Sequence, residues 1–175
     1  MNRSLRRLVL AALFLAIALL LPLLTGQLHA LGNALCPMHL PVLLCGFICG
    51  PWYGLAVGLV APLLRFVCFG APTLFPRGVA MALELAAYGG FAGLFYRLFP
   101  RRTPFLYLSL LLAMLTGRLV WGAARTAFSF ASPAAAPFSA AVFFADGFAS
   151  ALPGILLQLA VIPPLVRLGT RKAIG

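Results

Sequence analysis

The chain has 175 residues, of which 63% are hydrophobic and only 9% are charged. A water-soluble domain of this length needs more charge to cover its surface, so the composition excludes that class and indicates an integral membrane protein. The formal net charge of +11 does not indicate a nucleic-acid partner, because most of the cations flank apolar segments.

Six apolar segments are predicted to be membrane-spanning helices, which together form one all-α bundle over residues 1–175. Their approximate ranges are 6–25, 38–50, 52–69, 77–97, 104–126 and 141–167. Most have close to the ~20 residues that cross a ~30 Å hydrocarbon core. The second is short, and Gly50-Pro51 separates it from the third, because proline lacks a backbone N–H and disfavours helix in the preceding residue. A tight hairpin is therefore expected between these two segments.

Basic residues stand at every second boundary between the segments. They are nine of the thirteen cations: Arg3, Arg6, Arg7, Arg97, Arg101, Arg102, Arg167, Arg171 and Lys172. Cytoplasmic loops of membrane proteins are enriched in such residues, so both termini are predicted to be cytoplasmic. The first segment is interpreted as a retained helix and not as a cleaved signal peptide, because its apolar core over 8–24 is longer than a signal core.

Small residues recur every four positions in several segments. The glycines with this spacing are Gly46, Gly50, Gly54 and Gly58, followed by Gly89 and Gly93. Such spacing lets helix backbones approach closely in lipid, and it predicts tight packing inside the bundle. Ala12 and Ala16 have the same spacing on the first segment, where that face either packs internally or docks another membrane subunit.

The remaining ionisable residues all map to the outer third of the bundle or to its rim. They are Arg65, Arg77, Glu84, Arg118, Arg125 and Asp146. A charge at mid-bilayer costs about 2.5–3.5 kcal/mol, so such residues usually face a polar cavity or a partner. Either they line such a cavity, or Glu84 and Asp146 form two structural ion pairs. Two arginines would then be left over, and this surplus positive charge favours an anionic or acceptor-rich ligand.

Aromatic side chains accompany these charges on the helix faces. Arg118, Trp121 and Arg125 share one face, as do Glu84 and Tyr88. An aromatic ring beside an arginine commonly holds a flat or carboxylated small molecule. The predicted substrate-binding residues are Arg118, Glu84, Arg65, Arg125, Trp121, Tyr88, Asp146 and His39. The substitution Arg118→Ala is expected to abolish binding while leaving the fold intact.

His39 lies between two prolines at the predicted outer mouth of the second segment, where its imidazole either caps the helix or contacts substrate. The apolar connection over 128–141 is either a lid over the site or an interfacial loop. Cys36-Pro37-Met38-His39 gathers soft ligands but matches no zinc pattern, so no metal and no other cofactor is predicted. No hydrolase elbow, zinc-protease motif or Walker motif is present, and the chain is not expected to be an enzyme.

Three stretches resemble the substrate-binding S component of energy-coupling factor (ECF) transporters: "MHLPVLLCGFICGPWYGLAVGLVAPLLR", "FGAPTLFPRGVAMALELAAYGGFAGLFYR" and "LPGILLQLAVIPPLVRL". The resemblance implies a six-helix bundle in a bacterial or archaeal plasma membrane that binds a vitamin or related micronutrient on the extracytoplasmic side. It also implies a transmembrane coupling subunit and two cytoplasmic ATPases as partners, and rotation of the whole bundle in the membrane to release the ligand.

In that family an Ala-x-x-x-Ala face on the first helix meets the coupling subunit, and Ala12 and Ala16 match it. Pantothenate, a flavin and a nucleoside-like precursor are all compatible ligands. Two other classes stay open. One is a secondary transporter coupled to protons through Glu84 or Asp146, and the other is a six-span membrane scaffold without a ligand.

Overall fold

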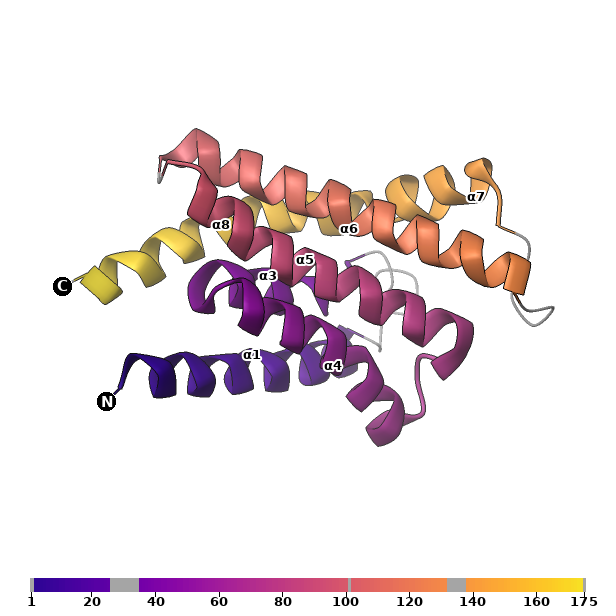
Figure 1. Cartoon of the computed structure of the whole chain (residues 1–175), viewed down its shortest axis with the longest axis horizontal. Coiled ribbons are helices and arrows are strands. Elements are labelled where there is room, and N and C mark those ends of the chain that lie inside the picture. The colour runs from indigo at the N-terminus through magenta and orange to yellow at the C-terminus, as the bar shows by residue number, and fades with distance from the viewer. Residues whose placement is uncertain (1, 26–34, 101, 132–137, 175) are drawn as a thin grey trace.

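The computed structural model describes residues 2–25, 35–100, 102–131 and 138–174, and nearly all of them are helical. In chain order the elements are α1 (Arg3–Thr25), α3 (His39–Cys49), α4 (Pro51–Phe69), η1 (Leu74–Gly78), α5 (Val79–Leu98), α6 (Thr103–Ala131), α7 (Ala140–Phe144), η2 (Ala145–Ala149) and α8 (Leu152–Ile174). The long helices run side by side along one axis, and both termini lie at the same end of the bundle, on the left of Figure 1. The all-α prediction is confirmed for the described residues.

Five helical segments among the described residues are long and apolar enough to cross a membrane. They are Arg3–Leu24, Pro51–Phe69, Leu74–Leu98, Thr103–Ala131 and Leu152–Gly169. The short helix α3 has 11 residues, and at 1.5 Å per residue it covers only about half of a ~30 Å hydrocarbon core. Six complete crossings therefore stay a prediction, because α3 is too short to span the core alone.

The apolar run over 141–167 is divided between three elements instead of forming one helix. It begins in α7, passes through the wide turn η2, and continues in α8 after a break at Ser150 and Ala151. Pro153 is the second residue of α8, where its missing N–H costs no helical hydrogen bond. Pro153 is therefore compatible with a new helix that begins here. Asp146 lies in η2, before the break.

The expected hairpin is present between α3 and α4. Gly50 has a φ of 108°, in the region that favours glycine, and its N–H donates to the Gly46 carbonyl at 3.1 Å. Pro51 is then the first residue of α4, where proline is well tolerated. These two residues turn the chain back on itself and place α3 beside α4.

Close backbone contact joins α3 and α4 to α5, and the spaced glycines make it. A Cβ atom at Gly46 or Gly54 would overlap the carbonyl oxygen of Gly89, and a Cβ at Gly58 would overlap that of Leu85. Small residues are needed here because any side chain would push the helices apart. The predicted internal role of these glycines is confirmed.

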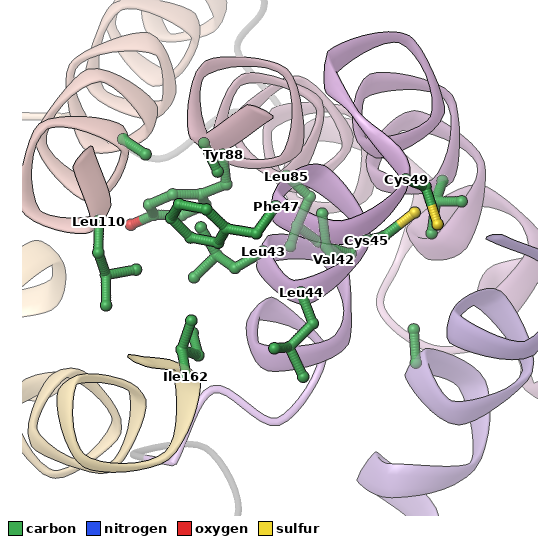
Figure 2. Packing of buried hydrophobic residues seen from close by; sticks show 14 of the residues in the cluster. Val42, Leu43, Leu44, Cys45, Phe47, Cys49, Leu85, Tyr88, Leu110 and Ile162 are labelled. Atoms are coloured by element: carbon green, nitrogen blue, oxygen red, sulfur yellow. The ribbon is translucent and has the colours of Figure 1, made fainter. Parts of the chain in front are cut away.

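The core of the bundle is built around α3, whose side chains point both toward α5 and α8 and toward the opposite side, where Cys45 and Cys49 lie (Figure 2). Leu43 of α3, Leu85 of α5, Leu110 of α6 and Ile162 of α8 are each completely buried. Burial in lipid adds little hydrophobic free energy between helices, so tight packing has to hold this centre together.

The two alanine faces of α1 have different surroundings. Ala11 and Ala18 are buried in the core, whereas Ala12 and Ala16 are exposed. The Ala12/Ala16 face therefore does not pack inside the bundle. It is open to lipid or to another membrane protein.

Candidate functional site

The centre of the site is an ion pair between α5 and α6. Arg118 Nη1 donates a hydrogen bond to Glu84 Oε1 at 2.7 Å, and both residues are at most 8% exposed. Gly117 lets α6 approach α5 closely beside this ion pair, since a Cβ at Gly117 would lie only 2.9 Å from the Tyr88 ring. One of the two ion pairs expected as an alternative to a cavity is therefore present.

His39, the first residue of α3, completes the group from a third helix. Its Nε2 atom lies 3.5 Å from Glu84 Oε1, and its ring meets the Tyr88 ring edge-on with centroids 5.0 Å apart. The interpretation of His39 as a helix cap is wrong, because neither ring nitrogen has a hydrogen-bond partner among the described residues. The imidazole points instead toward Glu84 and Tyr88. These two residues, His39 and Arg118 are called the buried polar group below.

Cys36 adds a thiol just before α3, and the sequence suggested it only as a soft metal ligand. Its Sγ atom lies 4.0 Å from Arg118 Nη2, and its backbone has a φ of 46°, which is uncommon outside glycine. Burial raises the pKa of the Cys36 thiol, with Glu84 acting in the same direction and Arg118 against it. The side chain is therefore protonated at neutral pH.

Several polar atoms of the buried polar group have no protein partner among the described residues. They are Nδ1 and Nε2 of His39 and Nε of Arg118. A buried polar atom without a hydrogen bond costs about 1–3 kcal/mol, so such atoms are rarely retained without a use. Their positions suit hydrogen bonding to a small polar molecule.

An aromatic wall stands beside Arg118, and it joins α6 to the region before α8. The Arg118 guanidinium lies 6.0 Å from the centroid of Trp121, which contacts Phe138 at 5.3 Å edge-on and Phe143 at 6.1 Å in a stacked arrangement. Gly147 faces the same two side chains, since a Cβ there would lie 3.7 Å from Trp121 Cζ3 and 3.9 Å from Arg118 Cδ.

Phe138 and Phe143 were not among the predicted site residues. They lie in an apolar stretch, where nothing in the sequence distinguishes them from the neighbouring apolar residues. Phe138 belongs to the connection discussed as a lid, and its contact with Trp121 places the end of that connection against the wall. Residues 132–137 of the connection lie outside the described residues.

Three of the predicted site residues do not join the buried polar group. Arg65 lies on α4 with its guanidinium 6.0 Å from the Phe69 ring, and Arg125 lies 5.6 Å from the Phe138 ring. Asp146 is exposed on η2 and forms no salt bridge with any described residue. The second ion pair considered in the sequence analysis is thus not found in the described part of the chain.

Two other features of the described residues do not define the site. No three His, Cys, Asp or Glu side chains among them lie close enough together to hold a metal ion. A groove of about 540 Å³ runs between α4 and α5, but Arg97 is the single charged residue among its otherwise apolar lining. It does not include the buried polar group, and such a surface is typical of contact with lipid.

Comparison with known families gives one match. A family model described as ECF transporter, substrate-specific component, matches residues 6–166. No curated protein and no solved structure was found to match the chain.

Proposed function

Because the chain belongs to the family of substrate-specific components of ECF transporters, we propose that it captures a vitamin or related micronutrient outside the cell for ATP-driven import. A member of this family is a subunit of a membrane transporter and not an enzyme. It works with a transmembrane coupling subunit and ATPases, which accounts for a transport protein that has no nucleotide-binding motif of its own.

The buried polar group carries the proposal. Glu84, Arg118 and His39 come from three helices and meet inside a bundle whose core is largely apolar. Ionisable residues at such positions are expensive, and they mark substrate pathways more often than they serve packing. The distribution of basic residues predicts that this end of the bundle faces outward, where an importer has to meet its substrate.

The exposed face of α1 supports the proposed assembly. Ala12 and Ala16 present two small side chains, four residues apart, that the bundle itself does not use. A second helix can approach closely along such a face. We propose that this face contacts the coupling subunit, and that rotation of the bundle against this subunit releases the substrate inside.

Reconstitution into proteoliposomes tests the function. The purified chain alone should bind one member of a panel of radiolabelled riboflavin, pantothenate and nicotinamide, and it should transport none of them. Uptake should require the coupling subunit, the ATPases and internal ATP. Uptake by the chain alone under a proton gradient would instead identify a secondary transporter, and Glu84→Gln should then abolish it. A chain that captures no small molecule, either from this panel or from a cell extract, would contradict both functions and favour a scaffold.

A further inference from the structure

The formal charges of the Glu84–Arg118 pair cancel. Glu84 and Arg118 are joined at 2.7 Å, and each is more than nine-tenths buried. Glu84 and Arg118 contribute one negative and one positive charge, which sum to zero. This pair therefore has no net charge to match against a charged ligand.

Arg65 and Arg125 lie outside the buried polar group. They contact Phe69 and Phe138, respectively, and neither has a salt bridge to a described residue. An anionic ligand that binds Arg118 would share it with the Glu84 carboxylate. Two negative charges beside one guanidinium in a low-dielectric interior are strongly unfavourable. The pairing of Arg118 with Glu84 therefore disfavours an anion at this guanidinium.

The polar atoms without partners define what the site can recognise. Arg118 Nε is a donor, and the His39 imidazole offers two ring nitrogens without a partner among the described residues. A carbonyl oxygen or ring nitrogen would accept from Arg118, while an amide or hydroxyl group would complement His39. Trp121 adds a flat apolar surface 6.0 Å from the same guanidinium.

We propose that the molecule bound at this site has no net charge at neutral pH and is an amide or heterocycle that hydrogen-bonds to Arg118 and His39. The inference rests on the proposed function, since it names the substrate class of the same site. Glu84 then has two roles: it holds Arg118 in place, and it excludes anions.

Matched pairs of compounds that differ in charge test this proposal. Nicotinamide and nicotinate, pantothenol and pantothenate, and riboflavin and its 5′-phosphate can each be titrated calorimetrically into the detergent-solubilised protein at pH 7.5. The uncharged member of the pair that binds should do so at least about tenfold more tightly. The variant Glu84→Gln frees Arg118, so it should lose that preference or reverse it. Arg77→Gln changes the charge by one unit at the exposed rim and should leave the preference unaltered.

The wild-type measurement decides the question even if Glu84→Gln does not fold. If no pair binds, the protein can be incubated with a bacterial metabolite extract and the retained compound identified by mass spectrometry. A retained uncharged compound supports the inference. Tighter binding of the anionic member, or retention of an anion, would overturn it while leaving the proposed function intact. Retention of no compound at all would overturn the proposed function itself.

Discussion

Two pairs of residues in α5 contact the neighbouring helices in different ways. Toward its N-terminus, Glu84 and Tyr88 use long polar side chains to reach α3 and α6. Toward its C-terminus, Gly89 and Gly93 use no side chain at all, and their backbones lie directly against α3 and α4. Tyr88 and Gly89 are adjacent in the chain, yet Tyr88 fills the space between helices with a polar side chain, whereas at Gly89 there is room for no side chain.

This difference separates contacts made by polar side chains from contacts made by backbones alone. Of the two regions, only the one around Glu84 and Tyr88 has polar atoms without protein partners among the described residues, and these atoms belong to His39 and Arg118. At Gly89 and Gly93 the backbones of neighbouring helices are in direct contact, which leaves no room for a side chain.

The largest effect on stability is expected when only one partner of the Glu84–Arg118 ion pair is removed. Arg118→Met leaves the Glu84 carboxylate buried without its partner, and this should lower the free energy of unfolding by about 3–5 kcal/mol. Adding Glu84→Gln should restore much of that loss, because no buried charge then remains. Thermal unfolding of the two single variants and the double variant in detergent measures the coupling. Equal losses in the Arg118→Met single variant and the double variant would contradict it. The earlier expectation that removal of Arg118 leaves the fold intact is revised for the same reason.

A smaller loss is expected from adding a methyl group where the backbones are in direct contact. A Cβ at Gly89 would overlap the Gly54 backbone, so Gly89→Ala should cost at least about 2 kcal/mol. The neighbouring Gly90→Ala is the matched control, because its Cβ would meet only the Leu55 side chain at an ordinary 3.5 Å. Gly90→Ala should be neutral or slightly stabilising, since alanine favours helix. Similar melting temperatures for the two variants would show that the close packing does not exist.

The buried and the exposed face of α1 should also respond differently to a larger side chain. Ala18→Leu enlarges a completely buried residue and should cost about 1–3 kcal/mol. Ala16→Leu lies on the exposed face, so its stability should change by less than about 0.5 kcal/mol. If the proposed interface is correct, Ala16→Leu should reduce co-purification with the coupling subunit more than Ala18→Leu does. Normal complex formation by Ala16→Leu would exclude this face.

The smallest effect concerns the reactivity of Cys36 next to the buried polar group. Its raised pKa leaves less thiolate at pH 7.5 than an ordinary thiol has, so maleimide should label it more slowly than the exposed Cys68. The labelling rate should increase as the pH rises toward the thiol pKa. Mass spectrometry of peptides after short exposure to maleimide measures both sites in one sample. Labelling of Cys36 that is as fast as that of Cys68 would place its thiol outside the buried region.

Sequence patterns predicted much of the fold because they act locally. The apolar runs, the Gly50-Pro51 hairpin and the glycine spacing each depend on residues within a few positions of one another. The break inside 141–167 was missed although Asp146, Ser150 and Pro153 lie at or beside it, because hydropathy averaged over a whole segment does not report a local interruption. The short length of α3 was visible in the sequence, but its central place in the core was not.

The site was predicted in part. His39, Glu84, Tyr88, Arg118 and Trp121 were all named from their rarity or their helical spacing, and they do lie together. Arg65, Arg125 and Asp146 were named on the same grounds but lie apart from the buried polar group. Depth along a helix can be counted from the sequence, whereas the direction in which a side chain points depends on how the helices are rotated.

The sequence by itself indicated a membrane-embedded helical protein, with both termini at one end of the bundle and the ionisable residues that do not flank the segments near the other end. Composition and spacing are sufficient for these properties, because the bilayer imposes them on each segment separately. The tertiary structure decided which carboxylate pairs with which arginine, and it thereby showed that Arg118 is paired with Glu84 and is not part of the surplus positive charge. That pairing joins residues 34 positions apart on different helices, and only the packing of those helices brings them within 2.7 Å.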